Sequence, residues 1–331
     1  MKSYMGIDVG SVSTNIVLID EKGKLIEKLY IRTNGQPIDA VKKGLKLIEE
    51  KIKANGKSVE IAGVGTTGSG RKLAAVIVGA DVVKNEITAH AVAAMNHVPG
   101  VQTVIEIGGQ DSKLIIIRNG VVSDFAMNTV CAAGTGSFLD QQAARLNLPI
   151  EKFSKLALNA QAPVRIAGRC SVFAESDMIH KQQMGHNLSD IIAGLCDALV
   201  RNYLNNVGKG KEILVPIVFQ GGVAANEGMR EAFRKALNTE IIVPENFDVM
   251  GALGAAFLAR EAVVQNNQKT VFKGFDTVDH DFKVKGFECS GCPNLCEVVE
   301  IYENFQVLAR WGDRCGKWTE THQELKQVSF N

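Results

Sequence analysis

The sequence predicts an α/β protein with two similar lobes and a small cysteine-rich module at its C-terminal end. Short apolar runs alternate with longer helical patterns along most of the chain. The opening stretch, MGIDVGSVSTNIVLIDEKG, recurs in outline as VIEIGGQDSKLIIIRNG, which begins near residue 104. Four of the seven cysteines lie in the last stretch, 283–331. A chain of 331 residues, 46% of them hydrophobic, is long enough to bury more than one core.

The first lobe is expected to span residues 1–100. Three apolar strand patterns open it, namely YMGIDVG, SVSTNIVLID and KLIEKLYI. A helical pattern over Ile38 to Ala54 and a further strand, VEIAGVGTTG, follow. The first two strands form a hairpin with a glycine in its turn.

The second lobe is expected to span residues 101–248 and to begin with the repeated hairpin. Helices are predicted after Cys131, over Ser171 to Gln183 and over Leu188 to Val207. A strand, ILVPIVFQGG, a helix from about residue 227 and a strand, EIIVP, complete the lobe. The next helix, residues 249–263, is expected to pack back onto the first lobe. A linker, 264–282, and the cysteine-rich module, 283–331, then follow.

Composition excludes several classes of function. The formal net charge is +1, and charges of both signs are mixed along the chain, so no basic stripe indicates nucleic-acid binding. The first residues, MKSYM, lead into an apolar strand without the apolar core of a signal peptide, and no uncharged run is long enough to span a membrane. We therefore expect a cytoplasmic protein, in which cysteines serve metal or redox chemistry.

Two of the hairpin turns have the composition of phosphate-binding turns. Gly10 is followed by small and hydroxyl residues, whose exposed backbone N–H groups can face an anion. Asp8 precedes this turn and suits a water-mediated Mg²⁺ shell. The second turn ends in Gln110 and Asp111, an amide and a carboxylate that can orient water or metal for phosphoryl transfer. Taken alone, either turn is also compatible with plain turn chemistry.

A third glycine-rich element, FQGGVAANEG, ends an apolar strand and opens a helix. Gly221 and Gly222 there would allow the close approach of a flat ring or a ribose. Neither a P-loop motif nor a first-strand GxGxxG is present, which disfavours P-loop and dinucleotide-binding folds.

These three elements, in this order, resemble the ATPase superfamily shared by actin, sugar kinases and Hsp70 chaperones. The matching segments are residues 6–15, 105–113 and 219–228, with a linking helix over 250–259. The resemblance implies two lobes around a nucleotide cleft, with Asp8, Gln110 and Asp111 as the catalytic residues and Asp8 on Mg²⁺. The residues implied to bind ATP or ADP are Gly10, Ser11, Val12, Ser13, Thr14, Asn15, Gly108, Gly109, Gly221, Gly222 and Val223.

Two isolated cysteines, Cys131 and Cys170, each precede a predicted helix among small residues. A helix N-terminus favours a thiolate or another anionic ligand. A [4Fe–4S] cluster generally takes four cysteines, so two per chain would require a homodimer that shares one cluster. From spacing alone, buried structural cysteines remain the alternative.

The segments around these cysteines, NTVCAAGTGSFLDQQAARL and GRCSVFAESDMIH, resemble the ATP-dependent activators (component A, or archerases) of 2-hydroxyacyl-CoA dehydratases, of the BadF/BadG/BcrA/BcrD-type ATPase family. The resemblance spans roughly residues 4–262. It implies an ATP-hydrolysing one-electron reductase of anaerobic metabolism, in which Cys131 and Cys170 of two identical subunits bind one [4Fe–4S] cluster. Many relatives carry Lys where this chain has Asn15, which puts one phosphate contact in doubt.

The same resemblance implies the partners. The electron donor would be a ferredoxin or flavodoxin, and no nucleic acid or membrane is involved. The acceptor would be a 2-hydroxyacyl-CoA dehydratase, an aryl-CoA reductase such as benzoyl-CoA reductase, or a double-cubane-cluster protein. The last is suggested because tails similar to this one occur in longer activator-like relatives.

The C-terminal module carries a metal-binding spacing. Two cysteines at C-x2-C spacing are followed by a third nearby and a fourth after two apparent strands. Zn²⁺ and a second Fe–S cluster both suit four thiolates, and a reduced cysteine-rich tail is the alternative. The four residues are Cys289, Cys292, Cys296 and Cys315. Cys196, on the apolar face of a helix, is expected to be simple core.

Two other functions fit the predicted fold. A small-molecule kinase, such as a sugar kinase, could use Asp111 as its catalytic carboxylate but has no need of Cys131 and Cys170. A purely structural ATP-dependent switch would leave the four tail cysteines unexplained. We therefore favour the reductase.

Overall fold

The structure, a computed structural model, describes residues 1–54, 56, 59–128 and 130–319. It separates into two compact units. Unit 1 comprises Met1–Ala89 with Gly251–Asn331, and unit 2 comprises His90–Met250. The last part of the expected C-terminal module, 320–331, lies outside the described residues. The lobe boundaries inferred from the sequence stay predictions.

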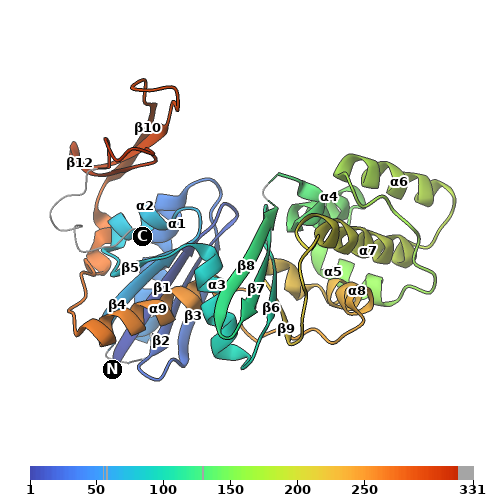
Figure 1. Cartoon of the computed structure of the whole chain (residues 1–331), viewed down its shortest axis with the longest axis horizontal. Helices are drawn as coiled ribbons and strands as arrows, with labels where there is room; N and C mark the ends of the chain where they lie inside the picture. Colours follow the sequence, from blue (N-terminus) through green and yellow to red (C-terminus); the bar gives the residue numbers. More distant parts are fainter. Residues whose placement is uncertain (55, 57–58, 129, 320–331) are drawn as a thin grey trace. The chain divides into compact units, whose positions relative to one another are not determined.

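Unit 1 is built on a five-stranded mixed sheet of order β3-β2-β1-β4-β5 (Figure 1). β1 pairs antiparallel with β2 and parallel with β4, so the first hairpin leads into an α/β crossover. Met5, Ile7 and Val9 of β1 share one apolar cluster with residues of α1 and α2. The elements are β1 (Lys2–Val9), β2 (Ser13–Asp20), β3 (Leu25–Arg32), α1 (Pro37–Ala54), β4 (Glu60–Thr67), α2 (Arg71–Val78), β5 (Val82–Val83) and α3 (Glu86–His97), whose last part belongs to unit 2.

The other face of this sheet carries helix α9 (Met250–Asn266), which crosses β1 and β4 (Figure 1). Glycines make this close approach possible. A Cβ at Gly6 would lie 1.9 Å from the carbonyl oxygen of Ala252, and a Cβ at Gly65 would lie 2.2 Å from that of Ala255. The helix backbone therefore rests on strand positions that have no side chain.

The segment after α9, expected to be a linker, packs against unit 1. Thr270 and Val271 both donate hydrogen bonds to the carboxylate of Asp81, and the Thr277 hydroxyl donates to the carbonyl oxygen of Ile77. A 3₁₀ turn, η3 (Phe275–Asp279), leads to a separate antiparallel sheet of order β10-β11-β12. Its strands are β10 (Phe282–Glu288), β11 (Glu297–Glu303) and β12 (Gln306–Trp311).

Unit 2 repeats the strand arrangement of unit 1. Its sheet has the order β8-β7-β6-β9, with β6 antiparallel to β7 and parallel to β9 (Figure 1). The order β3-β2-β1-β4 in unit 1 has the same directions, so the repeat seen in the sequence is a repeat of topology. These strands are β6 (Thr103–Ile107), β7 (Ser112–Arg118), β8 (Val121–Asn128) and β9 (Ile217–Gln220).

Helices pack on one face of this sheet around Phe138, Phe153, Tyr203 and Phe233, all fully buried. The helical elements are η1 (Ala132–Gly134), α4 (Gly136–Arg145), α5 (Ile150–Leu158), α6 (Ser171–Gln183), α7 (Leu188–Asn206), η2 (Gly222–Ala225) and α8 (Glu227–Leu237). The fold class is therefore confirmed as mixed α/β with a duplicated core.

Two local expectations differ from the structure. The segment EIIVP makes only an isolated bridge, between Val218 and Ile242, instead of a strand. Pro244 ends this segment and has no N–H with which to extend a ladder. The strand expected over residues 213–222 is shorter, Ile217–Gln220.

Among the residues that the structure describes, no helix combines the length and apolar character needed to cross a lipid bilayer.

The contact between β1 and α9 predicts a strong effect of one methyl group. We expect Gly6→Ala to lower the free energy of unfolding by about 2 kcal/mol or more, because the new Cβ overlaps the Ala252 carbonyl. Denaturant unfolding measures this change. The matched control is Gly286→Ala in β10, where the nearest neighbour of a new Cβ is 4.0 Å away. Equal effects of the two substitutions would contradict the close packing of α9.

Candidate functional site

The two hairpins end in turns with the same internal hydrogen bond. In unit 1 the N–H of Gly10 donates to the carbonyl of Ser13 at 2.9 Å, and in unit 2 the N–H of Gly108 donates to that of Asp111 at 3.1 Å. In each turn, the N–H of this glycine is therefore already hydrogen-bonded within the turn. These two glycines shape the turns, and a phosphate group would have to be bound by the other amides.

The side chains of the first turn region differ in exposure and in hydrogen bonding. The hydroxyl of Thr14 is buried and lies 3.0 Å from that of Thr33, which itself donates to the Gly10 carbonyl at 3.0 Å. Asn15 is 6% exposed, and its Oδ1 has no hydrogen-bond partner in the described part of the chain. Ser11 is exposed, whereas Val12 and Ser13 are half-buried. Ser11 is thus the residue of this turn that is most open to a ligand.

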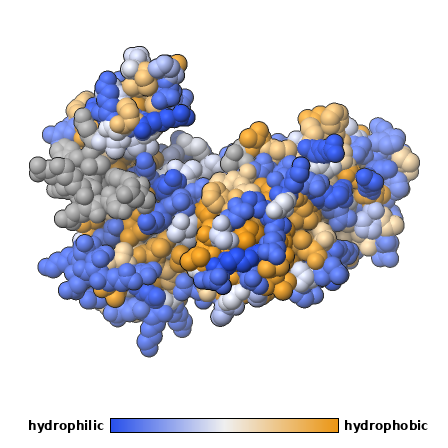
Figure 2. Space-filling view, in the orientation of Figure 1, coloured by the Kyte–Doolittle hydropathy of each residue, from blue (hydrophilic) through white to orange (hydrophobic). Residues whose placement is uncertain are grey.

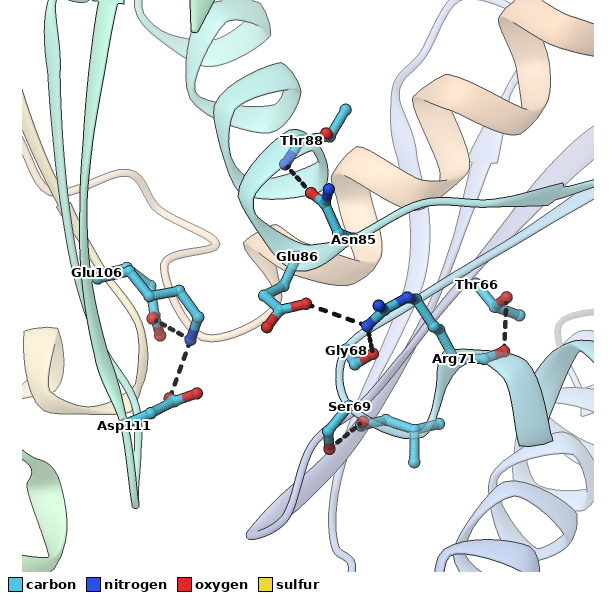
Figure 3. A network of polar contacts seen from close by, with 11 residues as sticks. Thr66, Gly68, Ser69, Arg71, Asn85, Glu86, Thr88, Glu106 and Asp111 are labelled. Atoms are coloured by element: carbon cyan, nitrogen blue, oxygen red, sulfur yellow. Dashed lines mark hydrogen bonds and ion pairs between the residues drawn. The ribbon is translucent and has the colours of Figure 1, made fainter. Parts of the chain in front are cut away.

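Asp8 lies beside the loop between β4 and α2. A Cβ at Gly68, whose φ is +86°, would lie 2.4 Å from Asp8 Oδ1, and the N–H of Gly70 donates to the Val9 carbonyl at 2.9 Å. Arg71 closes the loop by donating to the Gly68 carbonyl at 2.8 Å and approaching Glu86 at 3.4 Å (Figure 3). The loop thus packs closely against the predicted Mg²⁺ carboxylate.

A buried ion-pair network underlies the second turn. Lys113 Nζ, on β7, lies 2.9 Å from both Glu106 Oε2, on β6, and Asp111 Oδ1 (Figure 3). The side chains of Lys113 and Glu106 are only 5% and 6% exposed. Burial lowers the pKa of Lys113, but the two carboxylates outweigh it and raise this pKa overall. Asp111 is therefore fixed by Lys113, while Gln110 is exposed at the tip of the turn.

The third glycine-rich element lies directly against the second turn. A Cβ at Gly221, whose φ is +88°, would meet the Ile107 carbonyl oxygen at 2.5 Å and Glu106 Oε1 at 2.7 Å. Gly221 is buried, Gly222 is exposed and Val223 is 8% exposed. Gln220, just before them, is buried and bonds through Nε2 to Nδ1 of His90 at 2.8 Å. The structure thus brings the predicted adenosine motif and second phosphate motif together within unit 2.

Helix α4 begins on the second turn. The N–H of Gly136 donates to the Gly108 carbonyl at 2.9 Å, and the N–H of Ser137 donates to the Gly109 carbonyl at 2.8 Å. The Ser137 hydroxyl also donates to the Gly109 carbonyl. The first N–H groups of a helix have no partner within it, and here the turn provides the acceptors. The turn and the start of α4 are thereby joined by backbone contacts.

Cys131 is the N-cap of the 3₁₀ turn η1, which leads into α4. Asn128 fixes its backbone, since the side-chain amide donates to the Cys131 carbonyl at 2.9 Å and accepts from its N–H at 3.0 Å. The Cys131 thiol donates to the carbonyl oxygen of Arg169 at 3.7 Å. Cys170 follows Arg169 and is the N-cap of α6. The two cysteine segments are therefore neighbours, and both thiols are partly exposed.

Helix α7 connects the second cysteine segment to the ion-pair network. Asn202 donates to the carbonyl oxygen of Gly168 at 2.6 Å, and the adjacent Tyr203 donates through its hydroxyl to that of Lys113 at 2.7 Å. Burial and the nearby Glu106 raise the pKa of Tyr203 well above its ordinary value, so this hydroxyl remains a donor. Both cysteine segments are thus hydrogen-bonded to elements that hold the second turn.

Sequence reasoning missed these connecting residues. The available signals were charged or amide side chains within apolar stretches, such as Glu106 in VIEIGG and Asn202 in ALVRNYL. A buried polar side chain needs a partner, but the sequence does not say which one. The sequence did not single out Ser137, because its hydrogen bond to Gly109 is made through the backbone N–H as well as the side chain. The prediction for Cys196 is confirmed: it is buried, and desolvation raises its pKa to about 12.

The tail cysteines do not form a ligand set in the part of the chain that the structure describes. In the described ranges, which end at residue 319, no three His, Cys, Asp or Glu side chains converge as a metal-ion site. Cys289 is buried, Cys296 is half-buried, and Cys292 and Cys315 are exposed. Hydrogen bonds from the Gly291 N–H and from the Trp318 indole lower the pKa of Cys289. The metal assignment of this module stays a prediction.

His90 provides a pH test of the buried polar contacts in unit 2. Burial, followed by the charge of Lys113, lowers its pKa from 6.5 to about 3. The folded state therefore holds His90 neutral, whereas the unfolded chain takes up a proton on His90 below about pH 6.5. The stability that neutral His90 contributes is complete above about pH 6.5 and is lost as the pH falls toward 3. We expect the free energy of unfolding of His90→Gln, which can still bond to Gln220, to fall less steeply than that of the wild type between pH 6.5 and 4. The difference between the two slopes should reach up to about 1.4 kcal/mol per pH unit. Denaturant unfolding at several pH values measures the slopes, and identical slopes would contradict this role of His90.

Comparison with known proteins places this arrangement in a family. Residues 5–259 match the BadF/BadG/BcrA/BcrD ATPase family. The (R)-2-hydroxyglutaryl-CoA dehydratase activating ATPase of Acidaminococcus fermentans is 34% identical over 258 residues, 77% of this chain and 96% of the relative. The crystal structure of component A of that dehydratase superposes with a TM-score of 0.72 at 32% identity, covering 80% of this chain and 100% of the other.

A second solved structure is the activator of the 2-hydroxyisocaproyl-CoA dehydratase from Clostridium difficile with bound ADPNP. It has a TM-score of 0.70 and 32% identity, and it covers 81% of this chain and 98% of the other. The family match ends before the segment that carries the tail cysteines. The sequence, the duplicated fold and these similarities together show that the chain belongs to the BadF/BadG/BcrA/BcrD ATPase family.

Proposed function

We propose that this protein is an ATP-hydrolysing activator that delivers one low-potential electron to a partner metalloenzyme. In this proposal two copies of the chain share one [4Fe–4S] cluster, held by Cys131 and Cys170 of each. The observation that carries it is the pair of backbone hydrogen bonds from Gly136 and Ser137 to the second turn. These hydrogen bonds link the predicted second phosphate motif to the helix that follows Cys131, within unit 2.

The donor set of one chain fits half of such a cluster. Cys131 Sγ lies 3.7 Å from the carbonyl oxygen of Arg169, the residue before Cys170, so the two cysteine segments of each chain lie side by side. A [4Fe–4S] cluster generally takes four thiolates, and a twofold axis would supply the other two. When bound, the cluster would supply the ability to accept and release one electron.

The surface around these thiols has the character of an interface. Val130 is 95% exposed, and Val172 and Phe173, in the first turn of α6, are 68% and 67% exposed. Figure 2 shows hydrophobic side chains at the surface of this part of unit 2. Large apolar side chains exposed together beside a functional group favour contact with another protein surface. A second copy of the chain would cover them and exclude water from the thiols.

Nucleotide binding is assigned to the two turns and the third glycine-rich element. Ser11, Ser13 and backbone amides of both turns other than those of Gly10 and Gly108 would bind phosphates. Gly221, Gly222 and Val223 would flank the adenosine, and Asp8 would hold Mg²⁺ through water. Gln110 and Asp111 would orient the attacking water, with Asp111 positioned by Lys113. A change in the second turn would then pass through Gly136 and Ser137 to Cys131.

The proposed partners follow from the family. Relatives are named as activators of 2-hydroxyacyl-CoA dehydratases and, in one case, as a subunit of benzoyl-CoA reductase. A 2-hydroxyacyl-CoA dehydratase or an aryl-CoA reductase is therefore proposed as the electron acceptor, with a double-cubane-cluster protein as the further candidate. A ferredoxin or flavodoxin is proposed as the donor, in a reducing cytoplasm. The kinase alternative gains no support, because it gives no role to the neighbouring segments that carry Cys131 and Cys170.

Removal of one cysteine tests the shared cluster. We expect anaerobically purified Cys131→Ala to contain about four fewer irons per two chains than the wild type, because half of the thiolate ligands of the cluster are gone. Iron analysis and the visible absorption spectrum measure the loss. Any iron bound by the tail cysteines is the same in both proteins, so it does not affect the difference between wild type and Cys131→Ala. Cys196→Ala, which removes a buried thiol of α7, is the matched control. Unchanged iron in Cys131→Ala would contradict the assignment.

Substitution of Gln110 tests the catalytic turn. Because Gln110 is exposed, we expect Gln110→Ala to fold normally and to hydrolyse ATP more slowly by about tenfold or more, with iron content unchanged. A phosphate-release assay and iron analysis give the two readouts. Gln268→Ala changes an exposed glutamine outside both turns and should leave both unchanged. A normal hydrolysis rate in Gln110→Ala would exclude the role, and loss of iron would show that the residue is structural.

A further inference from the structure

The sheet β10-β11-β12 brings all four tail cysteines to one end. Glu288, the last residue of β10, pairs with Glu297, the first residue of β11, and Val299 of β11 pairs with Trp311 at the end of β12. Cys289 therefore follows one strand, Cys296 precedes the next, and Cys315 follows the third at the same edge. We call this edge, residues 289–296 with 312–319, the cysteine end of the sheet.

Hydrogen bonds close the first cysteine segment into a compact loop. The N–H of Cys289 donates to the carbonyl oxygen of Cys296 at 2.8 Å, and the N–H of Leu295 donates to that of Cys292 at 3.2 Å. Leu295 has a φ of +43°, which an L-residue adopts only where the fold requires it. The loop thus fixes three thiols within a short backbone circuit.

The fourth cysteine is brought to this loop by the chain after β12. Asp313 accepts a hydrogen bond from the N–H of Trp318 at 2.8 Å, which folds the segment around Cys315. The Trp318 indole N–H then donates to Cys289 Sγ at 3.1 Å, and its ring contacts Phe287 edge-on at 5.0 Å between centroids. The Gly291 N–H donates to the same sulfur. N–H donors directed at one sulfur suit a thiolate ligand.

The opposite end of the sheet has a different means of support. Phe282, Ile301 and Ala309 are buried in the apolar cluster of unit 1. Along β10 only Phe282 is buried, and the strand becomes largely exposed toward Cys289. The two segments that form the cysteine end, 289–296 and 312–319, are mostly exposed, which is the situation in which small modules use a metal as a cross-link.

We propose that Cys289, Cys292, Cys296 and Cys315 form a four-thiolate metal centre, separate from Cys131 and Cys170, that stabilises the cysteine end of the sheet. Four thiolates suit Zn²⁺ and also an Fe–S cluster such as [4Fe–4S], and the experiment distinguishes zinc from iron. The thiols do not converge in the described structure, so binding would draw the loop and the Cys315 segment together.

The test uses the full chain with Cys131→Ala and Cys170→Ala, so that its result does not depend on the proposed function. Elemental analysis of anaerobically purified protein is expected to give about one zinc or about four irons per chain. Adding Cys315→Ser or Cys292→Ser should remove that metal, whereas Ser290→Ala, in the same loop, should retain it. Absence of both metals from the parent variant, or metal retained after both cysteine substitutions, would overturn the proposal.

A second measurement covers the case in which a substituted tail fails to fold. In the parent variant, Cys292 and Cys315 are exposed and should react with iodoacetamide only after the metal has been removed with a chelator. Mass spectrometry of the alkylated peptides reads the protection of each thiol. Equal alkylation before and after chelation would overturn the proposal, and re-protection on adding Zn²⁺ alone would identify zinc as the metal.

Discussion

The hydrogen bonds from Gly136 and Ser137 to the carbonyls of Gly108 and Gly109 are the constraint on which the rest of this account depends. They satisfy the first amides of α4 with acceptors from the second turn. Beneath them, Lys113 is buried between Glu106 and Asp111, an arrangement that is costly to disrupt because a lone buried charge would remain. The turn and the helix that follows Cys131 therefore cannot move independently without breaking these contacts.

The duplicated fold was predictable because its signals are local. Apolar runs and glycine turns marked both hairpins, and the structure repeats the strand order and the Gly10 and Gly108 turn bonds. Within the repeat the two copies differ: the Asp8 and Asn15 pair of unit 1 corresponds in register to the Glu106 and Lys113 pair of unit 2. The isolated bridge at Ile242 was mistaken for a strand, because composition does not reveal how far pairing extends.

The candidate site was predictable only in part, because its contacts join distant segments. Spacing identified the turns and both cysteines, but not that Cys131 lies beside Arg169 or that Asn202 and Tyr203 connect Gly168 to Lys113. The hydrogen bond between the Thr14 and Thr33 hydroxyls was likewise not predictable, since a pattern of hydroxyl residues does not say which side chains meet, and the assignment of Thr14 to a phosphate stays a prediction. The sequence also did not indicate that Gly6 of β1 and Gly65 of β4 lie against the backbone of α9, because this packing joins segments that are far apart in the sequence.

The central claim is that a nucleotide-dependent change in the second turn reaches the Cys131 segment through α4. Amide hydrogen exchange of the anaerobic protein, compared with ADP and with a non-hydrolysable ATP analogue, tests it most directly. The account predicts that exchange in residues 105–112 and 130–140 changes together between the two nucleotides, while α5 serves as an internal reference. A change confined to 105–112, with 130–140 unaltered, would contradict it.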